Sequence, residues 1–169
     1  SNALSQFGDG TTADHLSPSV AAGGMTFVAI GAGNTFTCGL TAGGTAYCWG
    51  TNEYGQLGRG TIAGDSTGVP RPVSGGLTFA SVEVGGFHVC GITTGSDTYC
   101  WGVNIDGQLG DGTRTDNGTP RLVLGQAASA PASVGAAVAM SLPAGTKIPS
   151  VQSRGLMSSS ASNRLRRHR

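Results

Sequence analysis

Four cysteines are the residues of this chain whose type and spacing most directly suggest chemistry. They form two pairs, Cys38 with Cys48 and Cys90 with Cys100, and the members of each pair are ten residues apart. Glycine lies halfway between the members of each pair, where a tight hairpin would reverse the chain. Opposed residues of an antiparallel hairpin have Cα atoms about 4.5–5.5 Å apart, within reach of a disulfide. The spacing therefore predicts disulfides Cys38–Cys48 and Cys90–Cys100, with buried free thiols as the alternative.

Such disulfides would have consequences for stability and location. Short loops of this kind contribute about 2–3 kcal/mol each to the free energy of unfolding when they are unstrained. Disulfides persist in oxidising compartments. We therefore expect a secreted protein, extracellular or periplasmic.

Other metal-binding or catalytic chemistries find little support in the residue pattern. The cysteine spacing is not that of a CxxC zinc motif, and His88 is the only histidine within the cysteine-containing segments. His88 has no visible serine or cysteine nucleophile with an orienting carboxylate. Gly31-Ala32-Gly33 lacks the full GxGxxG spacing, and the loop aspartates are too irregular for an EF-hand. We expect no catalytic residue, metal or cofactor, and hence no enzyme.

The cysteines belong to a block that occurs twice. Residues 38–58 and 90–110 correspond at a constant offset of 52 residues. Equivalent positions include two tryptophans and two glutamines to which we assign structural roles, namely Trp49, Trp101, Gln56 and Gln108. Repeats of this size usually bury their apolar faces by stacking on neighbours, so the chain is predicted to be part of a repeat array.

Each repeat contains four short segments rich in β-branched and aromatic residues, with no competing helical periodicity. In the first repeat the expected strands are 26–30, 35–40, 45–49 and 69–73. In the second they are 78–84, 88–93, 98–101 and 121–124. Four strands in about 50 residues are typical of a β-propeller blade. The predicted fold is therefore all-β, with blades of four antiparallel strands.

The repeated string reads CGLTxxGxxYCWGxNxxGQLGxGT and is followed by a proline and GGLxF. Over residues 5–125 the chain resembles the regulator of chromosome condensation repeat, in its bacterial, cysteine-containing form. The resemblance implies a seven-bladed β-propeller that binds other proteins. Because the chain holds two full repeats and one remnant, we expect a partial propeller that is completed by oligomerisation.

The expected organisation follows from this frame. Residues 1–3 resemble a scar from an expression tag and are left out of the fold, and residues 4–24 form the end of a preceding blade. Repeat 1 covers 25–75, and repeat 2 covers 76–126. The Ala/Ser/Pro-rich tail, 127–169, is expected to be a linker or to add strands at 133–142 and 146–151, with a basic end at 164–169.

The leading functional hypothesis is a protein-binding scaffold that presents loops from its blades. Its expected partner-binding residues are Asn34, Phe36, Glu53, Tyr54, Phe87, His88, Ile105 and Asp106. The alternative is a self-assembling homo-oligomer, whose subunits complete a propeller ring. A net charge of +1 gives the body no bulk attraction to nucleic acid, and no apolar run is long enough to span a membrane.

Overall fold

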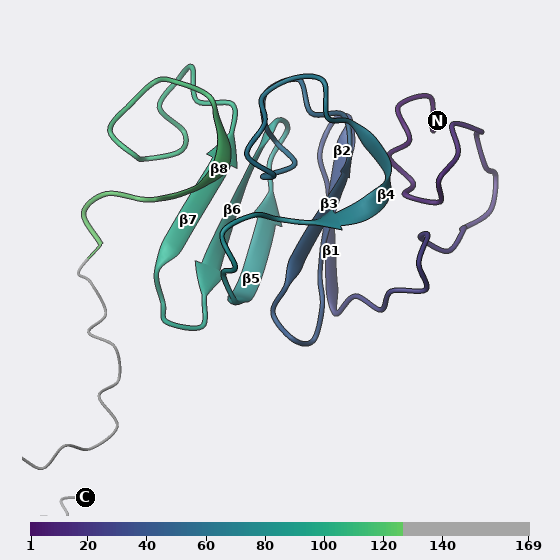
Figure 1. Cartoon of the computed structure of the whole chain (residues 1–169), viewed down its shortest axis with the longest axis horizontal. Coiled ribbons are helices and arrows are strands. Elements are labelled where there is room, and N and C mark those ends of the chain that lie inside the picture. Colours follow the sequence, from purple (N-terminus) through teal and green to yellow (C-terminus); the bar gives the residue numbers. More distant parts are fainter. Residues whose placement is uncertain (127–169) are drawn as a thin grey trace, which may run out of the picture. The chain divides into compact units, whose positions relative to one another are not determined.

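The computed structural model describes residues 1–126, and these contain eight strands in two four-stranded antiparallel sheets. The first sheet has the order β1-β2-β3-β4, and the second has the order β5-β6-β7-β8 (Figure 1). The strands of the first sheet are β1 Ala29–Ala32, β2 Phe36–Leu40, β3 Ala46–Gly50 and β4 Thr67–Pro72. Those of the second are β5 Phe79–Val84, β6 His88–Thr93, β7 Thr98–Gly102 and β8 Asn117–Leu122. The expected all-β fold, with four antiparallel strands in each repeat, is confirmed.

The central hairpins of the two sheets have the same register. Cys38 lies opposite Cys48 in the β2–β3 pair, and Cys90 lies opposite Cys100 in the β6–β7 pair. The two third strands also share an irregularity in their pairing with the fourth strand, immediately before the glycine that ends each of them. Residues at equivalent positions in the two repeats can therefore be compared directly.

The predicted bounds of the outer strands were wrong. The last strand was expected at 121–124, whereas β8 covers Asn117–Leu122, and β4 likewise begins before Val69. The fourth strand of repeat 2 was expected to begin after Pro120, yet Pro120 lies inside β8, as Pro70 lies inside β4. Since β4 and β8 are edge strands of their own sheets, each pairs with a neighbouring strand on one side only. A proline in such a strand, which lacks an N–H, therefore removes no hydrogen bond to a second neighbouring strand.

The two sheets stack through β1, β2 and β5, and one apolar core lies between them. Repeat 1 contributes Phe36, Cys38, Leu40, Ala46, Cys48 and Leu57, while repeat 2 contributes Phe79, Val89 and Trp101. Trp101 is fully buried, and its ring lies 5.8 Å from that of Phe79. The core of the described residues is thus shared between the repeats, as stacked repeats require.

The N-terminal segment contains no strand, but it contains a loop with the same hydrogen bonds as the later repeats. Asn2 Oδ1 accepts from Phe7 N at 2.9 Å, and its Nδ2 donates to Thr11 O at 3.0 Å. Asn52 makes the same pair of bonds with Leu57 N and Thr61 O. Asn2 is also buried. Asn2, which the sequence analysis left out of the fold, thus holds this loop as Asn52 holds its own.

The expected tail strands at 133–142 and 146–151 and the basic end at 164–169 lie outside the described residues. Across residues 1–126 there is no helix long and apolar enough to cross a membrane.

Candidate binding surface at the loop end

Two kinds of loop lie at one end of the two sheets. Because neighbouring strands run antiparallel, the turns after the first strands and the long loops after the third strands emerge at the same end. The turns are 33–35 and 85–87, and the long loops are 51–66 and 103–116. We call this end of the sheets the loop end, and it carries most of the predicted partner-binding residues.

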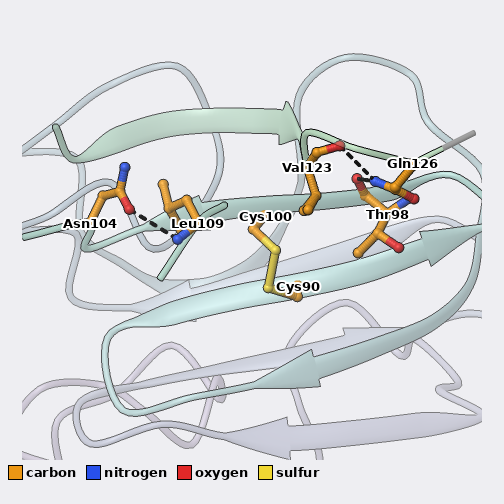
Figure 2. The surroundings of a disulfide bond; sticks show 7 residues. All are labelled: Cys90, Thr98, Cys100, Asn104, Leu109, Val123 and Gln126. Atoms are coloured by element: carbon orange, nitrogen blue, oxygen red, sulfur yellow. Dashed lines mark hydrogen bonds between the residues drawn. A yellow bond between two sulfur atoms is a disulfide. The ribbon is translucent and has the colours of Figure 1, made fainter. Parts of the chain in front are cut away.

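An asparagine side chain fixes each long loop from the inside. Asn104 Oδ1 accepts from Leu109 N at 2.9 Å, a contact visible in Figure 2, while its Nδ2 donates to Thr113 O at 3.1 Å. The backbone N–H of Asn104 donates to Asp116 Oδ1 at 2.7 Å. Since Asn104 is buried and bonded at both ends of its side chain, the loop is preorganised rather than freely mobile.

Asp111 reinforces the second loop electrostatically. Its carboxylate accepts from Thr113 Oγ1 at 2.7 Å, from Thr113 N at 2.9 Å and from Asn104 Nδ2 at 3.1 Å. These bonds, led by the one from the Thr113 hydroxyl, hold the pKa of Asp111 below its ordinary value because they favour the charged form. Arg59 occupies the equivalent place in the first loop and pairs with Asp65 at 2.8 Å.

Gln56 connects the first long loop to the second repeat. Its side-chain Oε1 accepts from Tyr54 N at 2.8 Å, and its backbone carbonyl accepts from Trp101 Nε1 at 3.1 Å. Trp49 makes the equivalent bond to Gln6 O at 2.9 Å. Gln108 Oε1 accepts from Asp106 N at 2.9 Å, as Gln56 Oε1 accepts from Tyr54 N. Each tryptophan is therefore tied to the loop of the preceding unit.

A hollow of about 220 Å³ opens at the loop end where the two repeats meet. It is lined by Tyr54, Phe87, Val103, Ile105 and Asp116. The rings of Tyr54 and Phe87 come from different repeats and meet edge to face, with centroids 5.6 Å apart and planes at 74°. Ile105 lines the same hollow as the two rings and is 64% exposed. The arrangement is an apolar recess with one carboxylate at its wall.

The structure brings together three of the predicted partner-binding residues, Tyr54, Phe87 and Ile105, in this hollow. Asn34 is exposed beside it, and its N–H donates to Gly86 O at 3.0 Å. Glu53 and Asp106 are exposed on the same loops but do not line the hollow.

Two other predicted residues point elsewhere. Phe36 is 0% exposed and belongs to the core between the sheets, so its assignment to a partner surface was wrong. It is the first residue of β2 and packs inward. His88 begins β6 and is half-buried; a side chain built at Gly85 would meet the His88 ring.

Sequence reasoning missed two residues of the hollow, Val103 and Asp116. Val103 follows the repeated Trp-Gly pair where repeat 1 has Thr51, so its apolar character was a usable signal. Asp116 gave no such signal, because nothing in the sequence showed that the loop folds back to place it beside Asn104.

Both cysteine pairs lie at disulfide distance. The Sγ atoms of Cys38 and Cys48 are 2.09 Å apart and those of Cys90 and Cys100 are 2.08 Å apart. The first bond lies in the core between the sheets. In the second bond, drawn in Figure 2, Cys100 is buried and Cys90 is half-buried. Within residues 1–126, no cluster of three or more His, Cys, Asp or Glu side chains is arranged to hold a metal ion.

Comparison with known families shows which repeat the chain contains. The model of the regulator of chromosome condensation (RCC1) repeat matches residues 43–92 and 97–140. A second model of the same repeat matches residues 27–56. Together these matches cover more than half of the chain.

Curated relatives carry the same repeats in longer proteins. The chain is 37% identical over 102 residues to the E3 ubiquitin-protein ligase HERC2 of Homo sapiens, a match covering 59% of this chain and 2% of that protein. It is 31% identical over 120 residues to the ultraviolet-B receptor UVR8 of Arabidopsis thaliana, covering 70% of this chain and 27% of the receptor. The chain thus spans only a small part of these relatives.

Solved structures show the same fold at lower identity. Prp20p from Saccharomyces cerevisiae, described with its binding to Gsp1p and histones, superposes with a TM-score of 0.60 at 19% identity. That match covers 72% of this chain and 32% of Prp20p. Human WBSCR16 gives a TM-score of 0.57 at 20% identity, covering 73% of this chain and 33% of that structure.

Proposed function

The chain belongs to the regulator of chromosome condensation repeat family, and on that premise we propose that it is a non-enzymatic scaffold that binds a partner protein through the hollow at its loop end. The observation that carries this proposal is the recess lined by Tyr54, Phe87, Val103 and Ile105. Aromatic side chains in an apolar recess, surrounded by polar loops, are typical of the energetic centre of a protein interface.

The size of the hollow favours a protein partner over a small molecule. Its volume, about 220 Å³, is below the roughly 300–1,000 Å³ of most small-molecule sites. It fits a single side chain presented by another protein. The hydrogen bonds of Asn52 and Asn104 hold both loops in place, so little conformational entropy is lost on binding.

Structural neighbours are consistent with this use. Prp20p is described as binding Gsp1p and histones, and a second structure shows it bound to Kap60. These partners belong to Prp20p, and their identity does not transfer at this level of similarity. What we carry over is the class of ligand, another protein.

The test is a selection from a phage-displayed library of random peptides on the full chain. We expect enriched peptides that bind the wild-type protein and lose about tenfold or more in affinity to Ile105→Ser, which removes the apolar side chain without adding a charge. The control is Ile62→Ser, because Ile62 is 50% exposed on a loop at the same end and does not line the hollow. Equal binding to both variants, or no enrichment, would reject the proposed surface.

A second candidate function, self-assembly into a homo-oligomer, rests on a different observation. The chain contains two tryptophans, and they are already bonded to the carbonyls of Gln6 and Gln56. No tryptophan of the chain remains for the equivalent carbonyl of Gln108. On the face of repeat 2 that is turned away from repeat 1, here called its outer face, Ile92 is 45% exposed, whereas the equivalent Leu40 of repeat 1 is 3% exposed. A second copy of the chain would bury this face of repeat 2, as repeat 2 buries the equivalent face of repeat 1.

Absolute mass from size-exclusion chromatography with light scattering, over a hundredfold dilution, tests self-assembly. The hypothesis expects a defined oligomer that Ile92→Asp dissociates without changing the circular dichroism spectrum. A compact monomer at every concentration would reject it.

We also propose, from the two disulfides, that the protein is secreted into an oxidising compartment. The redox state of the four cysteines in protein recovered from its native source tests this proposal separately.

A further inference from the structure

We propose that the hollow at the loop end is a site for an arginine side chain of the partner, an inference that rests on the function proposed above. Three features of the described residues lead to it: the geometry of the two rings, the position of Asp116, and the charge of the surrounding loops. Each feature selects for a cation, and together they select for a planar cation on an apolar stem.

The rings of Tyr54 and Phe87 form two walls that meet at an angle of 74°. An edge-to-face pair presents at least one ring face to the space beside it, and aromatic faces attract cations within about 6 Å of the ring centre. Tyr54 is 38% exposed, so an incoming side chain can reach its ring without opening the core. Because the rings come from different repeats, the site exists only where the repeats are stacked.

Asp116 supplies a negative charge at the wall of the same recess. One of its oxygens accepts from Asn104 N at 2.7 Å, which fixes the position of the carboxylate. A carboxylate can accept several hydrogen bonds, so capacity remains for a further donor. Asp116 takes part in neither of the two ion pairs found among residues 1–126, which join His15 to Asp9 and Arg59 to Asp65.

The surrounding loops are acidic. The loops 51–66 and 103–116 contain the carboxylates of Glu53, Asp65, Asp106, Asp111 and Asp116. Their basic residues are Arg59, which is paired with Asp65 at 2.8 Å, and Arg114. The excess of negative charge favours a basic segment over an acidic or neutral one and raises its rate of encounter.

The remaining lining explains why the cation should be arginine. Val103 and Ile105 offer apolar surface to a methylene stem, which basic side chains bury while the charged end stays polar. A guanidinium group is planar, stacks on aromatic faces and bonds a carboxylate through two N–H groups, whereas an ammonium group is a compact and strongly hydrated point charge. The recess therefore favours arginine over lysine.

The experiment uses the same phage-displayed peptide library and two variants of the full chain. Asp116→Asn removes the charge but keeps an oxygen that can accept from Asn104 N. Tyr54→Leu removes the ring but leaves the backbone bond to Gln56. Both variants are first checked for unchanged thermal unfolding. Binding of each enriched peptide is measured by fluorescence anisotropy, with its arginine intact and replaced in turn by lysine, citrulline and leucine.

We expect the peptides that depend on Ile105 to share an arginine. Replacing it by citrulline, and separately changing Asp116 to Asn, should each weaken binding about tenfold, and the two changes together should not add. Tyr54→Leu should weaken the arginine peptide by about 5- to 30-fold, the range expected when a cation–π contact of about 1–2 kcal/mol is lost.

The other outcomes separate the two proposals. Peptides that depend on Ile105 but carry an aliphatic or aromatic anchor, and that bind Asp116→Asn as well as wild type, would overturn the arginine site and leave the protein-binding function standing. Lysine equal to arginine would overturn the preference for a planar cation. If no peptide depends on Ile105, both the site and the proposed function are rejected.

Discussion

The two repeats have equivalent strands, the same register in their central hairpins and equivalent disulfides, yet equivalent positions differ in their burial. Leu40 on β2 is 3% exposed, whereas the equivalent Ile92 on β6 is 45% exposed. Cys38 is buried, and Cys90 is only half-buried. The difference arises because the second repeat packs on the face of the first sheet that carries Leu40 and Cys38, whereas the equivalent face of the second sheet has no such neighbour among residues 1–126. The local structure of a repeat thus follows from its own sequence, and its burial follows from its neighbour.

The residue types on the two faces reflect this difference. At the hairpin tip of repeat 1, Gly44 has a φ of +79°, and a Cβ there would lie 2.8 Å from Phe79 O of repeat 2. The equivalent Ser96 also has a positive φ, 71°, but is not glycine. A side chain at Gly44 is therefore excluded for two reasons: it would collide with repeat 2, and the positive φ of this position disfavours residues other than glycine.

A polar side chain binds the backbone at the start of β7 and the end of β8 in repeat 2. Gln126 Oε1 accepts from Thr98 N at 2.7 Å, and Gln126 Nε2 donates to Thr98 O at 2.9 Å and to Val123 O at 3.0 Å (Figure 2). These bonds satisfy backbone groups at this edge of the sheet.

The largest effect should come from the residue that joins the two repeats. We expect Trp101→Ala to lower the free energy of unfolding by about 3–5 kcal/mol, because it removes a fully buried ring from the shared core. Trp101→Phe keeps a ring and loses the bond to Gln56 O, so it should cost about 1 kcal/mol beyond any packing change. Urea unfolding measures both. Equal losses for the two variants would show that the hydrogen bond, not packing, joins the repeats.

Equivalent aliphatic residues provide the next test. Leu40→Ala should cost about 2–5 kcal/mol, because it empties part of the core, whereas Ile92→Ala should change stability by no more than about 0.5–1 kcal/mol. Urea unfolding of the two variants, at a protein concentration where the mass is known, gives the comparison. If Ile92→Ala proved as costly as Leu40→Ala, the outer face of repeat 2 would be covered in solution.

The disulfides should differ in their accessibility to a reductant. We expect Cys90–Cys100 to be reduced before Cys38–Cys48, because the sulfurs of the first repeat are sealed between the sheets. Limited reduction, alkylation and mass spectrometry would follow this order, and tryptic cleavage after Arg59 separates the two pairs. Simultaneous reduction would mean that the repeats separate before either bond is attacked.

The smallest effect concerns pH. Bonds from Thr113 and Asn104 hold the pKa of Asp111 below its ordinary value in the folded state, so the unfolded chain binds a proton more readily. The resulting stabilisation is complete above the ordinary aspartate pKa, near 4, and is lost as pH falls through the lowered folded-state value. Asp111→Asn should therefore flatten the acid limb of a plot of unfolding midpoint against pH. An unchanged acid limb would contradict this.

The repetition of one sequence block explains why much of the fold was predictable. Cys38 and Cys48 mark the register of a hairpin, and the second pair repeats it, so strand order and pairing follow from local spacing. The start of β8 was less predictable because Pro120 is acceptable only at a sheet edge, and edge position is a tertiary property. The contacts of Asn2 were not predictable for a related reason, because they depend on a loop that closes through Thr11.

The sequence by itself determined the four-stranded unit, the opposition of the cysteines and the loops that carry Tyr54 and Ile105, because these depend on residues close together in the chain. Only the tertiary structure decided that Phe36 is buried, that Tyr54 meets Phe87 across the junction, and that Asp116 lies at the wall of the hollow. Burial and the meeting of loops depend on how one repeat stacks on the next, and no local pattern encodes that contact.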